Sequence, residues 1–149
     1  MILIRQLLFS FFMLLIAACS GSKNTTQTSA FTAPFVWENA NMYFMLTDRF
    51  NNGSTKNDVN FGRTKPTGLL RGFMGGDIRG ITKKIEDGYF SNLGITALWF
   101  TPVVEQIHDQ TDENTGATYA FHGYWAKDWT SLDPNFGTEK ELADLVAAA

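Results

Sequence analysis

Residues 93–102, with the sequence LGITALWFTP, contain the clearest fold signal in the chain. The run from Ile95 to Phe100 is mostly apolar, and Gly94 before it and Thr101-Pro102 after it are typical of element ends. A short apolar run with such borders predicts a strand that is buried on both faces, as in a parallel sheet. Residues 42–46, MYFML, form an earlier run of the same kind.

The segment between these runs predicts a helix over residues 78–93. Its apolar residues recur at spacings of three and four, which places them on one helical face: Ile78, Ile81, Ile85, Tyr89 and Leu93. Gly88 weakens this helix and Gly94 is a natural stop. A strand, a helix and a second strand in this order predict a right-handed βαβ unit with a parallel sheet.

Two long loops and a second helix complete the expected domain. Residues 51–77, rich in Asn, Gly and Asp, and residues 102–137 both read as loops. Thr138 to Glu141 match a capping box, and Leu142, Leu145 and Val146 follow at helical spacing. Two strands and two helices can neither close nor cover a sheet. Residues 36–149 are therefore expected to form an incomplete α/β domain.

The N-terminal residues predict export and a lipid anchor. An almost wholly apolar run from Leu7 to Ala18 has the length of a signal-peptide core and is short for a membrane span. It ends in Ala17-Ala18-Cys19, which resembles a bacterial lipobox, although an ordinary secretory signal is the alternative. We expect residues 1–18 to be a lipoprotein signal peptide and residues 19–35 a flexible spacer after lipidated Cys19. The protein would then be lipid-anchored in a bacterial cell envelope, at the outer membrane or cell surface.

Composition excludes several functional classes. The formal net charge is −3 and the basic residues are scattered, so no stripe suited to nucleic acid is present. One cysteine permits neither an intrachain disulfide nor a zinc cluster of thiolates. The 14% of aromatic residues could form a core or stack on sugar rings, and composition does not distinguish the two.

The two loops hold the candidate binding residues. Oxygen-bearing residues in the first loop suit Ca²⁺, with a solvated loop as the alternative: Asn52, Ser54, Asn57, Asp58 and Gly75-Gly76-Asp77. The second loop contains residues 121–125, FHGYW, whose Tyr124 and Trp125 offer flat faces to a sugar and whose His122 can donate to a hydroxyl. Packing of the loop is an equal alternative for this motif. No carboxylate pair suited to glycoside hydrolysis stands out by spacing.

Taken in order, these motifs resemble the opening of a glycoside hydrolase family 13 (α-amylase family) enzyme. The matching segments are Tyr43 to Phe50 (YFMLTDRF), Gly75-Gly76-Asp77, Gly88-Tyr89, Leu93 to Trp99, Thr101-Pro102, His122 to Trp125, Asp128, and Asp133 to Gly137 (DPNFG). They are most similar to extracellular α-amylases and cyclodextrin glucanotransferases. The resemblance implies a (β/α)₈ TIM barrel, of which this chain holds the first two β/α units.

The resemblance also implies residue roles. A structural Ca²⁺ would be bound by Asn52, Ser54 (where an amide ligand is usual), Asn57, Asp58, the Gly75 carbonyl and Asp77. Tyr124 would stack on the sugar whose bond is cleaved, His122 would hydrogen-bond a hydroxyl, and Trp125 would support the wall.

The resemblance further implies a function for the complete protein. The catalytic Asp, Glu and Asp of the family's retaining mechanism come from later strands, beyond Ala149. The expected function is that of a surface α-glucan hydrolase or transglycosylase acting on starch or maltooligosaccharides. A non-catalytic, glycan-binding surface lipoprotein is the alternative.

Overall fold

The computed structural model describes residues 35–114 and 116–149. The predicted signal peptide, the predicted lipidation site at Cys19 and nearly all of the predicted spacer lie outside the described residues. Within the described part, no helix has the length and apolar character needed to cross a membrane.

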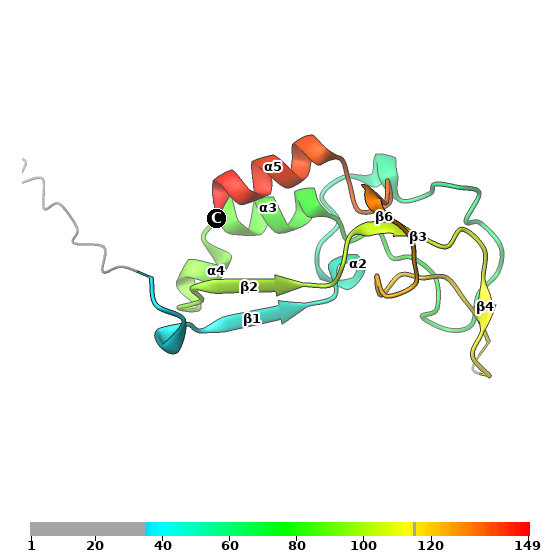
Figure 1. Ribbon diagram of the computed structural model, residues 1–149, viewed down its shortest axis with the longest axis horizontal. Helices are drawn as coiled ribbons and strands as arrows, with labels where there is room; N and C mark the ends of the chain where they lie inside the picture. Colours follow the sequence, from blue (N-terminus) through cyan, green and yellow to red (C-terminus); the bar gives the residue numbers. More distant parts are fainter. Residues whose placement is uncertain (1–34, 115) are drawn as a thin grey trace, which may run out of the picture. The chain divides into compact units, whose positions relative to one another are not determined.

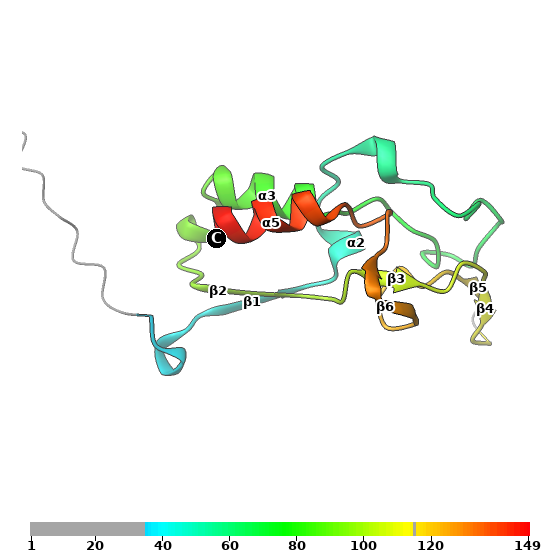
Figure 2. The same cartoon turned by 45° about the horizontal axis from the view of Figure 1, so that its top comes forward.

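The predicted βαβ unit is confirmed. Strands β1 (Met42–Met45) and β2 (Ala97–Phe100) pair in parallel, with Met42 opposite Ala97 and Met45 opposite Phe100. Helix α3 (Ile78–Glu86) lies between them in the sequence and packs beside α5 (Glu139–Ala148) on one side of the strand pair (Figure 1, Figure 2). Both helix starts are capped: Asp77 accepts a bond from the Gly80 amide, and Thr138 and Glu141 form the predicted capping box.

The core lies between the strand pair and these two helices. Its buried residues come from β1, the helices and two connecting segments: Met45, Ile78, Ile81, Phe90, Val103, Phe136 and Leu145. Ile78 and Ile81 are fully buried, as expected from the apolar face of α3.

The predicted burial of both strand faces is wrong for this chain. Phe44 and Trp99, on neighbouring strands, are 49% and 56% exposed, and their rings meet edge to face at 5.4 Å. The described elements cover only the face that carries Tyr43 and Met45, so the other face remains open.

The single helix predicted over residues 78–93 is also wrong. Helix α3 ends at Glu86, and a separate turn of helix, α4, runs from Tyr89 to Asn92. Gly88 between them has φ of 77°, a left-handed conformation that interrupts a right-handed helix. This turn redirects the chain so that Phe90 enters the core.

The loop predicted over residues 102–137 contains four strands. β3 (Val104–Gln106) pairs antiparallel with β6 (Ala126–Leu132), and β4 (Thr111–Asp112) pairs with β5 (Ala117–Thr118). These strands are short or polar and carry no regular alternation, so the usual strand pattern is absent from the sequence. A short helix, α2 (Thr47–Phe50), also follows β1, and the loop over residues 51–77 is confirmed apart from a 3₁₀ turn at Thr55–Asn57.

Candidate functional site

The loop that carries His122, Tyr124 and Trp125 lies against the carboxyl end of β2. Gly123 has φ of 85°, and a Cβ at this position would lie 2.2 Å from the carbonyl oxygen of Pro102. Only glycine fits so close to the chain that leaves β2. The carboxyl end of β1 is joined to the same place, because the Thr47 amide donates to Oγ1 of Thr101 at 3.1 Å. Parallel α/β folds hold their binding sites at this edge of the sheet.

His122 has a fixed hydrogen-bonding role in this loop. Its Nδ1 accepts a bond from the Tyr124 amide at 3.0 Å, which leaves the proton of the neutral ring on Nε2. Burial lowers the pKa of His122, and the charge of Glu113 raises it to a lesser extent. The ring is therefore kept neutral near pH 7, with Nε2 available as a donor.

The three predicted sugar-binding residues lie together. The Tyr124 ring is nearly parallel to that of His122 (19°, centroids 6.0 Å apart) and is 58% exposed, whereas Trp125 meets His122 edge to face at 4.6 Å. Trp125 is held in place because its amide donates to Oε1 of Gln106 and its carbonyl accepts from the Ile107 amide. An exposed aromatic face beside a hydrogen-bond donor is an arrangement that can bind a sugar ring.

Sequence reasoning missed Arg49 as a residue of this site. Its guanidinium lies 3.7 Å from the centre of the Phe121 ring, and Nη2 donates to the carbonyl oxygens of Leu70 and Gly72. Phe121 directly precedes His122, so Arg49 fixes the start of the loop at residues 121–125. The motif at Tyr43 to Phe50 contains Arg49, but nothing in the local pattern predicts a contact with Phe121.

Asp48 supports Arg49 from the core. Its buried carboxylate accepts bonds from the Met74 and Gly75 amides, and Arg49 Nε lies 2.9 Å from Oδ2 as an ion pair without an aligned hydrogen bond. Burial raises the pKa of Asp48 to about 6, against the lowering effect of these amides and of Arg49. Asp48 thus connects the end of β1 to the segment around Gly75.

The predicted calcium ligands converge in part. We call residues 52–77 the calcium loop after the ligands predicted there. In it, Nδ2 of Asn52 donates to Oδ1 of Asp58 at 2.8 Å. A Cβ on Gly75 would lie 2.3 Å from that nitrogen and 2.6 Å from that oxygen. These three residues therefore meet at one point, and only a glycine leaves room there.

The other predicted ligands, Asp77, Ser54 and Asn57, differ in how many hydrogen bonds their side-chain oxygens already accept. The Asp77 carboxylate accepts bonds from the amides of Gly53, Ser54 and Gly80, so it is shared with the start of α3. Oγ of Ser54 accepts only a long bond of 3.4 Å from the Lys56 amide. Oδ1 of Asn57 is buried and has no hydrogen-bond partner. A buried amide oxygen without a donor is unusual and fits a cation ligand.

The donor set decides which cation fits. Among residues 35–114 and 116–149, no group of three or more His, Cys, Asp and Glu side chains is placed to hold a metal ion. A cation in the calcium loop would therefore rely on amide and backbone oxygens together with Asp58 and Asp77. This set of hard oxygen ligands suits Ca²⁺ better than a transition metal.

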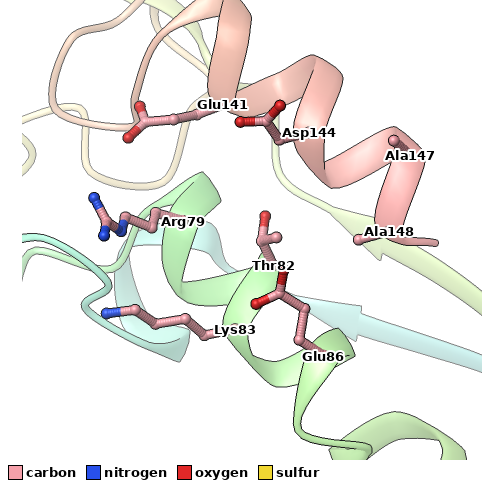
Figure 3. Close-up of a pocket in the computed structure, with 8 residues that line it drawn as sticks. All are labelled: Arg79, Thr82, Lys83, Glu86, Glu141, Asp144, Ala147 and Ala148. Atoms are coloured by element: carbon pink, nitrogen blue, oxygen red, sulfur yellow. The ribbon is translucent and has the colours of Figure 1, made fainter.

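An open cleft lies between α3 and α5. This cleft of about 650 Å³ is lined by Arg79, Thr82, Lys83, Glu86, Glu141, Asp144, Ala147 and Ala148 (Figure 3). Its lining includes positively and negatively charged side chains but no aromatic side chain, so it offers no aromatic ring on which a sugar could stack. The aromatic loop at residues 121–125 is therefore the better candidate for substrate binding.

The remaining loop carboxylates have local partners. Glu105 bonds to His108 and Lys127, and Asp109 bonds to Lys65. Asp128 accepts bonds from Thr130 and Ser131 of the same strand, β6. None of these carboxylates forms a pair that faces the aromatic loop.

Comparisons with known proteins point in one direction. The family description "Alpha amylase, catalytic domain" matches residues 44–149. The periplasmic alpha-amylase of Escherichia coli (strain K12) is 47% identical over 122 residues, which are 79% of this chain and 18% of that protein. A cyclomaltodextrin glucanotransferase of Thermoanaerobacterium thermosulfurigenes is 37% identical over 110 residues, 72% of this chain and 16% of that protein.

Solved structures agree. CldA, described as the first cyclomaltodextrin glucanotransferase with a three-domain ABC distribution, superposes with a TM-score of 0.63 at 34% identity, over 72% of this chain and 22% of that one. The alpha-amylase of Geobacillus thermoleovorans in complex with acarbose gives a TM-score of 0.55 at 32% identity, and the match covers 76% of this chain and 21% of that one. The chain spans about a fifth or less of the length of the curated relatives named above.

Proposed function

Because this chain belongs to the alpha-amylase family of catalytic domains, we propose that it contributes to a retaining enzyme that hydrolyses or transfers α-glucans such as starch and maltooligosaccharides. The catalytic domain of the family is a TIM barrel, and β1–α3–β2 forms part of one, with no closed barrel among the described residues. The nucleophilic Asp, the acid/base Glu and the stabilising Asp would come from sequence after Ala149.

One observation carries the substrate proposal. The exposed Tyr124 ring and the Nε2 donor of His122 lie side by side at the carboxyl end of β2, where the fold holds its substrates. Tyr124 would stack on the apolar face of a glucose ring while His122 donates to one of its hydroxyls. Trp125, which meets the histidine ring edge to face, would support the wall of the site. These residues bind and orient the sugar and do not break its bond.

A structural calcium ion is the second part of the proposal. The ion would be bound by Asn52, Asn57, Asp58, the Gly75 carbonyl and Asp77. Ser54 would be the weakest of the ligands. The convergence of Asn52 and Asp58 on Gly75 and the unpartnered Asn57 oxygen support this site. Bound there, calcium would supply positive charge and rigidity to a loop that has little secondary structure of its own.

The third part is a lipid anchor on Cys19. The apolar run from Leu7 to Ala18 and the small residues before Cys19 support export and lipidation. The protein would then act in the cell envelope, at the outer membrane or the cell surface.

The proposal is tested with the complete gene product and soluble starch. Release of reducing ends, or formation of cyclic products, supports an enzyme of this family. Binding of maltooligosaccharides without any bond cleavage would instead support a non-catalytic glycan-binding lipoprotein. A β-1,4-glucan serves as the control substrate and is expected to remain intact.

A further inference from the structure

A buried ion pair joins the calcium loop to the β3–β6 pair. Nη1 and Nη2 of Arg63 lie 2.8 and 2.7 Å from the two carboxylate oxygens of Asp133, and the two side chains are only 1% and 0% exposed. Nη2 of Arg63 also donates to the carbonyl oxygens of Gln106 and Ile107. This fork geometry holds Arg63 from several directions at once.

Asn135 extends this pair to two of the proposed calcium ligands. Its Oδ1 accepts a bond from Nη1 of Arg63, and its Nδ2 donates to the carbonyl oxygens of Asn57 and Asp58 at 3.1 and 2.8 Å. Asn135 is 2% exposed, so these bonds are shielded from water. The backbone of Asn57 and Asp58 is thereby fixed to a residue that Arg63 itself holds.

The same network orients the Asn57 side chain. Nδ2 of Asn57 donates to the Asn135 carbonyl at 3.2 Å, so its amide cannot turn over without losing that bond. Oδ1, at the other end of the amide, is left buried and without a partner. The orientation that creates this free oxygen therefore depends on the position of the Asn135 backbone, which the bonds of the Asn135 side chain help to fix.

We propose that Arg63 is a positioning residue for the calcium site, acting through Asp133 and Asn135 on Asn57 and Asp58. Arg63 does not touch the ion. It fixes in advance the segment that supplies two ligands, and so lowers the cost of ordering them when the ion binds. This inference rests on the calcium site of the proposed function.

The test measures calcium affinity in the complete gene product by titration with CaCl₂, at a temperature well below every variant's melting midpoint. Arg63→Met removes the charge. Asn135→Leu removes the side-chain bonds to the carbonyl oxygens of Asn57 and Asp58 and the bond to Arg63, and it leaves the Arg63–Asp133 ion pair in place. Lys65→Met is the matched control, since Lys65 lies in the same loop and pairs with Asp109 at 2.7 Å but is 61% exposed. We expect affinity to fall roughly 10- to 100-fold in the first two variants and to stay unchanged in the control.

Two further measurements separate positioning from general destabilisation. Amide hydrogen exchange of residues 57 and 58, with chelator present, is expected to accelerate in Asn135→Leu while that of the core strand β1 does not. Arg63→Lys, which keeps the charge but not the fork, is expected to recover part of the affinity.

The outcomes are distinct. Wild-type affinity in both Arg63→Met and Asn135→Leu would overturn the role of Arg63 and leave the calcium site standing. A wild-type protein that binds no calcium would contradict the calcium site and this assignment together. If Arg63→Met fails to fold, Asn135→Leu alone decides, because it retains the ion pair.

Discussion

The guanidinium of Arg49 lies 3.7 Å from the centre of the Phe121 ring, and this contact connects the carboxyl end of β1 to the aromatic loop at residues 121–125. The two residues are far apart in the sequence, yet Arg49 also holds the chain at Leu70 and Gly72. One side chain thus ties together the end of β1, the second half of the calcium loop and the residue before His122.

Arg49→Lys is expected to weaken substrate binding more than its conservative nature suggests. Lysine keeps the charge but cannot bond both carbonyl oxygens while stacking flat on Phe121. The lost stacking contributes about 1 kcal/mol, and the displaced loop would raise the KM for maltooligosaccharides several-fold. The KM of Arg79→Lys, on the exposed face of α3, serves as the control and should not change. Equal KM values for wild type and Arg49→Lys would remove the positioning role of Arg49.

His122 gives a prediction about pH. Burial lowers its pKa in the folded protein, so the unfolded chain, with a value of about 6.5, binds a proton first as the pH falls. The stability contributed by neutral His122 is therefore fully present above about pH 6.5 and is lost as the pH falls through that value towards the lower pKa of the folded state.

The measurement is the melting midpoint of wild type and His122→Gln from about pH 7.5 down to about pH 5. The advantage of wild type over the variant should shrink as the pH falls. A difference between the two midpoints that stays constant, or grows, over this range would contradict a buried, neutral His122.

Calcium removal is expected to destabilise the complete protein. A ligand that binds only the folded state stabilises it by about 2.7 kcal/mol when present at 100 times its dissociation constant. Excess chelator should therefore lower the melting midpoint, and Asp58→Asn should reduce the size of that effect. Asp109→Asn, which removes an exposed carboxylate outside the calcium loop, is the control. An unchanged midpoint with chelator would count against the site.

The lipid anchor is tested by changing Cys19 alone. Wild type is expected in the membrane fraction with fatty acid attached, whereas Cys19→Ala should lose the fatty acid and leave that fraction. If the wild-type protein is found in the soluble fraction without attached fatty acid, the result would support an ordinary secretory signal instead.

The βαβ unit, the start of α5 and the position of the aromatic loop were predictable from the sequence because they follow from local patterns. The apolar runs at residues 42–46 and 95–100 predicted a parallel pair, and the pattern at Thr138 to Glu141 predicted the start of α5. The position of the FHGYW loop followed from the rule that parallel strands place their sites at the carboxyl edge. Each of these predictions needs only neighbouring residues or the order of elements.

The errors share a physical cause, namely that contacts distant in sequence override or replace local signals. The break at Gly88 has a glycine as its only local sign, whereas the redirected chain is stabilised by the burial of Phe90. The β3–β6 pair lacks an apolar pattern because buried polar groups, including Asp133 and Gln106, hold it. The tie between Arg63 and Asn135 spans separate loops and has no local signature.

The most direct test compares Tyr124→Ala with wild type in hydrolysis of soluble starch by the complete gene product. Loss of the stacking face should lower kcat/KM roughly five- to tenfold, about 1 to 1.5 kcal/mol, while Tyr124→Phe keeps most of the activity. Trp129→Ala serves as the control. It removes an exposed aromatic ring that lies on β6, outside the loop at residues 121–125, and should leave kcat/KM unchanged. A wild type that releases no sugar from starch, or a Tyr124→Ala variant as active as wild type, would contradict the account.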